Sequence, residues 1–112
     1  MEHFTTVHNE TREGFDIELA RAYETQNPRE NFDDSIIDEI LEGIDSGKYE
    51  WFVARVTVSK YGVILGRDYL GGCLYESVSD FIKDAYFEDM VSNAIAEARA
   101  NISKLLEGCS YA

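Results

Sequence analysis

Alternating apolar and polar positions predict a β-hairpin in the middle of the chain, over residues 51–75. Apolar residues recur at every second position of Trp51–Val58, as expected for a strand with one buried face. The segment Ser59–Gly62 would form the turn, because glycine adopts positive φ at little cost. The extended pattern resumes at Val63–Leu65, and three later glycines indicate bends or close approach by another element: Gly66, Gly71 and Gly72.

A second hairpin is predicted ahead of this one. Its strands would be His3–His8 and Phe15–Tyr23, joined by the polar turn 9–14. A helix is the alternative for the second segment, because several of its apolar residues also share one helical face. We prefer a strand, since Ile17 would point into solvent on that helix. Pro28, which cannot donate to a strand ladder, would end this region.

The next apolar spacing is helical. Asn31–Ser35 would open this helix with a carboxylate cap and with acidic residues in the first turn, where the helix dipole favours them. Gly47 would end it. Five apolar residues would then share its inward face: Ile36, Ile37, Ile40, Leu41 and Ile44.

A longer helix is predicted near the end of the sequence. Ser77 would cap a short helical segment through Ile82, and the long helix would begin at Tyr86 or Phe87 and end at Gly108. One apolar stripe follows it at spacings of three and four residues: Phe87, Met90, Val91, Ala94, Ile95, Ala98, Ile102, Leu105 and Leu106.

Together these elements predict an α+β fold in the order ββαββα. The two hairpins would form a four-stranded antiparallel sheet with the two main helices packed on one face. A chain of 112 residues is expected to form a single globular domain, 1–112. Four residues of the long apolar stripe, Met90, Ile95, Ile102 and Leu105, should be buried against Phe52, Val56 and Leu65 of the central hairpin.

A formal net charge of −12 limits the classes of molecule that this protein is expected to bind. Direct binding to nucleic acid or to anionic membranes is not expected, because both need clustered Lys and Arg. No apolar run approaches the length of a membrane span, and Met1–Glu10 lacks the features of a signal peptide. We therefore expect a cytoplasmic protein in which Cys73 and Cys109 remain thiols.

The negative charge is concentrated in the first half of the chain. Residues 1–50 contain fourteen Asp and Glu against four Lys and Arg, whereas residues 51–112 contain eight against six. The densest part supplies the candidate partner-binding residues: Glu30, Asp33, Asp34, Asp38, Glu39, Glu42, Asp45 and Glu50.

Four of these carboxylates would form an outward row on the first helix: Asp34, Asp38, Glu42 and Asp45. With a rise of about 1.5 Å per residue, neighbours in the row lie roughly 5 to 6 Å apart. Phosphates along a DNA strand have a spacing of that order, so the row could imitate nucleic acid to a basic partner. The alternative is a solvated face kept for solubility, because like charges four residues apart cost only a few tenths of a kcal/mol.

Catalytic, metal-binding and cofactor-binding residues are not expected. Cys73 could act as a nucleophile with His3 or His8 as its base, but a buried thiol beside a glycine bend is the better interpretation. The pair His3 and His8 could bind a metal together with Cys73 or Asp68, but these residues lack the spacing of metal ligands. The pair Glu88-Asp89 is better interpreted as the acidic first turn of the long helix. We therefore predict that the protein is not an enzyme.

Tyrosines indicate a second kind of contact surface, since Tyr is enriched at protein interfaces. The candidates are Tyr61, Tyr69, Tyr75, Tyr86 and Tyr111. The alternative function is therefore a structural or regulatory homodimer, formed through a sheet edge or this Tyr-rich surface. Its negative charge would serve solubility alone.

Four segments resemble a family of small uncharacterised acidic proteins from phages, prophages and plasmids: Asn27–Arg29, Phe32–Asp34, Glu50–Ser59 and Gly66–Ser77. The similarity extends over about two thirds of the chain. Small acidic proteins of mobile elements often act against host defence, as anti-restriction and anti-CRISPR proteins do. The resemblance therefore implies an inhibitor or adaptor that binds a basic, nucleic-acid-handling host complex, and it brings no catalytic residue.

Overall fold

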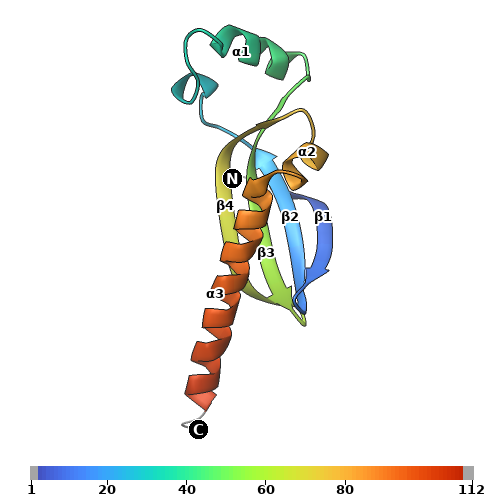
Figure 1. Ribbon diagram of the computed structural model, residues 1–112, viewed down its shortest axis with the longest axis vertical. Coiled ribbons are helices and arrows are strands. Elements are labelled where there is room, and N and C mark those ends of the chain that lie inside the picture. Colours follow the sequence, from blue (N-terminus) through green and yellow to red (C-terminus); the bar gives the residue numbers. More distant parts are fainter. Residues whose placement is uncertain (1–2, 110–112) are drawn as a thin grey trace.

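Four strands form one antiparallel sheet in the order β1-β2-β3-β4 (Figure 1). They are β1 (Thr5–Arg12), β2 (Phe15–Tyr23), β3 (Glu50–Lys60) and β4 (Val63–Tyr75). The computed structural model describes residues 3–109, with side chains up to Glu107, so Tyr111 lies outside the described residues. The predicted α+β class and the sheet of two hairpins are confirmed.

Two-residue turns close both hairpins. Glu13 and Gly14 have φ of 54° and 84°, and Tyr61 and Gly62 have φ of 53° and 78°. Left-handed conformations at both turn residues are typical of type I′ turns, whose twist matches that of the strands. The first hairpin is longer than predicted, because Asn9–Arg12 belongs to β1 and pairs with β2.

One face of the sheet carries the hydrophobic core. The long helix α3 (Ala85–Cys109) packs over β4 and β3, and the short helix α2 (Val78–Ile82) lies at its start (Figure 1). As predicted, Ser77 caps α2 by accepting a hydrogen bond from the Asp80 N–H. Alternate residues of β2 are buried in this core, which confirms a strand there: Phe15, Ile17 and Leu19. The other large core residues are Phe52, Val56 and Val58 of β3 and Phe81, Phe87, Met90, Val91 and Ile95 of the helices.

Gly66 allows α3 to approach β4 closely. A Cβ atom at this position would lie 2.2 Å from the carbonyl oxygen of Ala94 and 3.1 Å from the nitrogen of Ala98. Both alanines are fully buried. Of the two roles predicted for this glycine, close approach of another element is therefore confirmed.

The helix α1 (Ile37–Asp45) stands beyond one end of the sheet, which differs from the expectation that it packs on the sheet face (Figure 1). Its main packing neighbour is the short helix η1 (Pro28–Glu30). The reason is topological. β2 and β3 are antiparallel neighbours, so the connection between them starts and ends at the same end of the sheet and need not cross its face.

α3 extends past the opposite end of the sheet (Figure 1). The Asn101 side chain still donates a hydrogen bond to the Leu65 carbonyl at 2.7 Å. Beyond it, Leu105 is 63% exposed, so the prediction that this residue is buried is wrong. Leu106, which belongs to the same apolar stripe, is 65% exposed. The helix also continues one residue past Gly108, its predicted end. Neither α3 nor any other helix in the described part of the chain has the length and apolar character of a membrane span.

The α1 region and the α3 extension make the molecule long and narrow. Its principal extents are 60 × 27 × 24 Å, and its radius of gyration is 17.0 Å. A compact chain of this length would have a radius of gyration of about 13 Å. The two ends of the molecule are therefore well-separated surfaces.

Candidate functional site: an acidic lobe

The region between β2 and β3, residues 24–50, is called here the acidic lobe. It contains η1 and α1. η1 has a complete local cap, because Asn27 Oδ1 accepts from the Arg29 N–H at 3.0 Å and Pro28 takes the first helical position. The Asn27 carbonyl also accepts from the Glu30 N–H at 3.0 Å. This turn leaves the side chains of Arg29 and Glu30 exposed.

Trp51 and Glu24 anchor the acidic lobe to the sheet. Trp51 Nε1 donates to the Gln26 carbonyl at 2.9 Å, and its ring packs on Phe32 with ring centres 5.9 Å apart. The Glu24 carboxylate accepts from the Gly72 N–H of β4 at 2.6 Å and from the Gln26 N–H at 2.9 Å. Glu24 therefore adds negative charge to the lobe while its oxygens serve the fold.

Apolar contacts inside the lobe hold α1. Ile37 and Ile40 are buried. Tyr49 packs so closely on Gly43 that a Cβ atom there would lie 2.3 Å from the tyrosine ring. Gly47, with a φ of 83°, follows the end of α1 as predicted. The apolar face of α1 thus packs against residues of the lobe and not against the main core.

The start of α1 differs from the prediction. Its N-cap is Ile36, which has no side-chain acceptor, and the N–H groups of Ile36 and Ile37 both donate to the Asp33 carbonyl at 3.1 Å. A backbone carbonyl therefore replaces the predicted carboxylate cap in residues 31–35. Ile36, predicted to face inward, is 44% exposed because it lies before the first turn. Asp33 and Asp34 precede the helix and are exposed.

Seven of the eight candidate carboxylates are exposed: Glu30, Asp33, Asp34, Asp38, Glu39, Glu42 and Asp45. Glu50 differs from them, because it is half-buried and forms an ion pair with Arg21 of β2. Its charge already has a cationic neighbour in the fold. Glu50 is therefore the candidate least free to bind a partner.

Three of the exposed carboxylates share the outward face of α1. Asp38, Glu42 and Asp45 are spaced by four and three residues, which places neighbours roughly 5 to 6 Å apart on a helix. Asp34 is also four residues before Asp38, but it lies in the turn ahead of the helix. The helical part of the predicted row therefore has three members, with Glu39 beside them.

Few cations offset this charge. The acidic lobe contains nine Asp and Glu against Arg29 and Lys48. Arg29 Nη2 lies 4.0 Å from Asp38 Oδ1, and the Asp38 side chain is 93% exposed, so this pair contributes little. Lys48 Nζ lies 5.2 Å from the centre of the Tyr49 ring. The lobe therefore presents a strongly negative end to solvent.

Cys73 is a buried thiol in the core. Its Sγ donates to the Leu70 carbonyl at 3.4 Å, and burial raises the pKa of the thiol to about 11. His8 lies on β1 and Cys73 on β4, the two edge strands, so three strand spacings, roughly 14 Å, separate them across the sheet. The register also offsets them along the strands, because His8 pairs with Leu19 while Cys73 is level with Tyr23. The structure does not bring this cysteine and histidine together. Among the described residues, no group of three or more His, Cys, Asp or Glu could hold a metal ion.

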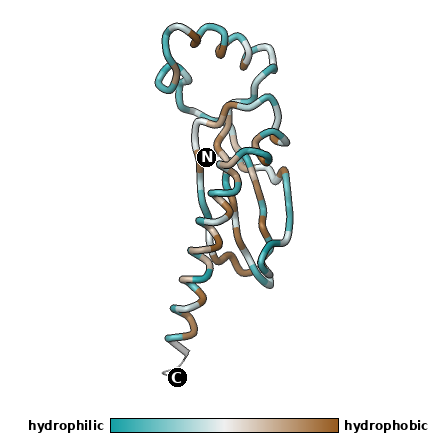
Figure 2. Tube along the Cα trace, viewed as in Figure 1, coloured by the Kyte–Doolittle hydropathy of each residue, from teal (hydrophilic) through white to brown (hydrophobic). Residues whose placement is uncertain are grey.

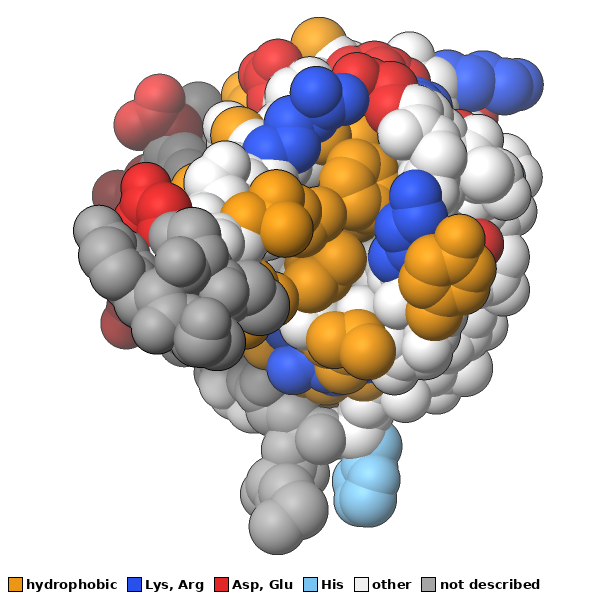
Figure 3. Space-filling view, turned by 90° about the horizontal axis from the view of Figure 1, so that it is seen from below, with side chains coloured by type: hydrophobic (Ala, Val, Ile, Leu, Met, Phe, Trp, Pro, Cys, Tyr) orange, Lys and Arg blue, Asp and Glu red, His pale blue; other side chains and the backbone are white. Residues whose placement is uncertain are grey.

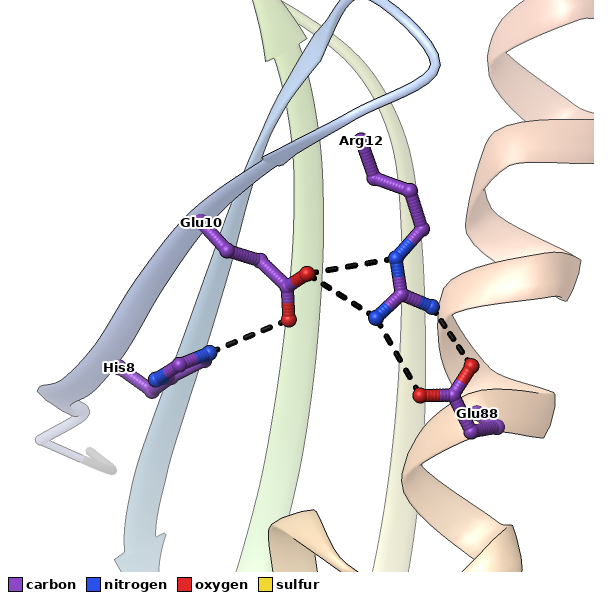
Figure 4. A network of polar contacts seen from close by, with 4 residues as sticks. All are labelled: His8, Glu10, Arg12 and Glu88. Carbon is purple, nitrogen blue, oxygen red and sulfur yellow. Dashed lines mark hydrogen bonds and ion pairs between the residues drawn. The ribbon is translucent and has the colours of Figure 1, made fainter.

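A charged network joins β1 to α3 (Figure 4). Arg12 Nη1 donates to Glu88 at 2.6 Å, its Nη2 donates to Glu10 at 3.0 Å, and Glu10 lies 3.1 Å from His8 Nε2. Burial alone would raise the pKa of Glu10, but hydrogen bonds with His8 and Arg12 outweigh it and lower that pKa. The His8 ring also packs edge-on against Phe87, with ring centres 5.9 Å apart.

This network was not predicted from the sequence. The available signal was alternation, since His8, Glu10 and Arg12 occupy every second position and so lie on one face of a strand. Their contacts dock the edge strand against the start of α3. Glu88 lies in the first turn of α3 as predicted, and its partner there is Arg12.

The described tyrosines are dispersed over the molecule. Tyr61, Tyr69 and Tyr86 are 91%, 54% and 57% exposed, and they belong to the β3–β4 turn, to β4 and to the start of α3. Tyr69 packs edge-on against Phe4, with ring centres 6.2 Å apart. Tyr75 donates to Asp84 at 2.8 Å. They do not gather into one tyrosine-rich surface.

Comparisons of the chain with protein-family models, with curated proteins and with solved structures find no match. The resemblance to phage and plasmid proteins therefore stays a prediction. The acidic lobe is the surface on which a function can be argued from geometry and charge.

Proposed function

We propose that this protein is a non-enzymatic binding protein whose acidic lobe engages a basic, nucleic-acid-handling protein or complex. The observation that carries the proposal is the position of seven exposed carboxylates on a lobe that stands beyond the end of the sheet. Charge kept only for solubility needs no such separation. A protruding acidic end, by contrast, can enter a groove that is lined by Arg and Lys for phosphates.

Each contact between a lobe carboxylate and an Arg or Lys of the partner would be a charge-assisted hydrogen bond. Long-range attraction would make association fast and sensitive to salt. By occupying a phosphate-binding groove, the lobe would exclude DNA or RNA from it. Inhibition of a host defence complex in the cytoplasm is the form of this function that the phage and plasmid resemblance favours.

Neutralising four carboxylates of the lobe tests the proposal. The variant carries Asp34→Asn, Asp38→Asn, Glu42→Gln and Asp45→Asn. Taking about 1 kcal/mol for each lost charge-assisted contact, binding to the partner should weaken on the order of a thousandfold. The fold should survive, because these side chains are exposed and their mutual repulsion is removed.

A charge-matched control changes four exposed carboxylates outside the lobe: Asp16, Glu76, Asp89 and Glu97. Parent, variant and control are compared by capture from a host lysate at low salt, with and without duplex DNA as a competitor. We expect the control to bind as the parent does and DNA to displace the partner. Equal capture by the lobe variant, or capture indifferent to both DNA and salt, would show that the proposal is wrong.

The alternative function, a homodimer whose charge serves solubility alone, predicts the opposite result. Neutralising the lobe would then leave every function of the protein intact. The same four-residue variant therefore distinguishes the two functions.

A further inference from the structure

The end of the molecule opposite the acidic lobe carries an apolar surface, called here the apolar end. Five of its large side chains are more than half exposed: Tyr61, Val63 and Ile64 at the β3–β4 tip, and Leu105 and Leu106 on the α3 extension. Figure 3 views this end and shows hydrophobic side chains gathered near its centre, with Lys and Arg beside them. Exposed apolar clusters of this kind mark interaction surfaces.

Leu105 continues the buried stripe of α3 past the sheet. It follows Phe87 by eighteen residues, which are five helical turns, so both lie on the same line along the helix. Phe87 is 1% exposed, whereas Leu105 is 63% exposed. Hydrophobic positions recur along the part of α3 that extends past the end of the sheet (Figure 2). After the Asn101 bond to β4, the remaining helix extends roughly 12 Å.

We propose that the apolar end binds a second copy of this chain and forms a two-fold symmetric dimer. The five side chains together expose the area of about three fully exposed large side chains, or roughly 600 Å² per copy. A standard protein interface buries about 800 Å² per partner. The apolar area exposed at this end is somewhat smaller than that of a standard interface, so we expect a reversible dimer.

Charge favours a second copy over the basic partner proposed for the acidic lobe. The apolar end, taken as residues 13–14, 60–64 and 99–107, carries Lys60, Arg99 and Lys104 against Glu13 and Glu107. The apolar end therefore has no excess of negative charge that would attract a basic partner. Two copies, in contrast, meet at the one end where their local charge is close to balanced.

The shape of the molecule removes the main objection to self-association, which is repulsion between two chains of charge −12. Each copy is 60 Å long, and the acidic lobe lies at the end away from the contact. The two lobes would thus lie many Debye lengths apart, since that length is about 8 Å at physiological salt. This inference does not depend on the function proposed for the lobe.

In the dimer, the α3 extension of each copy would contact the hairpin tip of the other, and two-fold symmetry would make this contact occur twice. Sedimentation equilibrium tests the association. We expect the apparent mass to rise from 12.7 kDa toward twice that value between low and high micromolar concentration. A mass that stays at the monomer value would overturn the proposal and leave the apolar end to a different protein.

The variant Leu105→Glu with Leu106→Glu tests the surface. It should weaken the dimer by at least about a hundredfold, because two apolar contacts are lost and each new carboxylate is placed against the apolar hairpin tip of the other copy. Ala96→Glu with Ala100→Glu is the matched control, since both residues are exposed and lie on the opposite face of α3. A dimer unaffected by the leucine changes would exclude this surface.

Methyl NMR spectra recorded during dilution locate the contact independently. Shifts should concentrate at Val63, Ile64, Leu105 and Leu106 and should be absent at Ile37 and Ile40 of the lobe. Dilution shifts confined to the lobe, or to the edge strand β1, would contradict the proposed interface.

Discussion

Gly66 offers a direct test of packing at the scale of one residue. In Gly66→Ala, the new Cβ would lie 2.2 Å from the Ala94 carbonyl oxygen, a backbone atom that moves only if α3 moves. We expect the free energy of unfolding to fall by about 1 to 3 kcal/mol, as in overpacked cores. Urea unfolding measures the change. Gly71→Ala is the comparison variant, and its loss should be smaller, because its Cβ would lie 3.0 Å from Glu24 Oε2, a side-chain atom that can shift while keeping its bond to Gly72. Equal losses in both variants would contradict the close helix contact.

Glu10 gives the fold an acid-sensitive contact. Because its pKa is lowered in the folded state, it contributes stability above its ordinary pKa of 4.5. That contribution is lost as the pH falls through the lower folded value. Glu10→Gln should therefore cost up to about 1 kcal/mol at pH 7 and flatten the loss of stability toward about pH 3. Urea unfolding at several pH values measures this, and Glu39→Gln in the lobe should keep the parent profile.

Single residues could be predicted from the sequence only where a local rule applied. Gly66 marked a close approach, and a buried thiol at Cys73 fitted the neighbouring glycine bend. The Arg12–Glu88 bond joins residues 76 apart in the sequence. Such a pair meets only after the strand register and the helix position are both fixed, and neither follows from the spacing of one segment.

The apolar stripe of α3 can be tested at the scale of the element. Ile95 is 4% exposed and Leu105 is 63% exposed, although both belong to the same stripe. Ile95→Ala should lower the free energy of unfolding by about 2 to 5 kcal/mol, because it leaves a cavity in the core. Leu105→Ala, measured at low protein concentration, should cost less than about 0.5 kcal/mol. Similar losses at both positions would mean that the extension packs on the same chain.

Periodicity predicted the type of each element better than it predicted what that element packs against. The alternation in β2 and β3 and the spacing in α3 follow from which face is apolar, and the sheet confirms them. The same spacing cannot say what covers an apolar face. The inward face of α1 is covered by residues of its own lobe. The apolar stripe of α3 continues past the end of the strands that cover the first turns of the helix.

The whole molecule is an elongated body with different chemistry at its two ends. The acidic lobe holds nine Asp and Glu against two cations, whereas the apolar end has nearly balanced charge. This division was visible in the sequence only as a difference between the two halves of the chain. Its placement at opposite ends depends on the β2–β3 connection staying at one end of the sheet and on α3 passing the other.

Salt should affect the two ends in opposite directions. Raising salt from about 50 mM to about 500 mM shortens the Debye length from roughly 14 Å to roughly 4 Å. Carboxylate contacts between the acidic lobe and a basic partner lose their long-range attraction, so that binding should weaken by tenfold or more. The dimer is held by apolar contacts and opposed only by residual repulsion between like-charged copies, so its association should stay constant or tighten by a few fold. Sedimentation equilibrium and capture titrations at both salt concentrations measure the two responses. The Leu105→Glu, Leu106→Glu variant should keep the salt response of the lobe and lose the dimer. A dimer that dissociates as salt is raised would mean that charge pairs, rather than the apolar end, hold the two copies together.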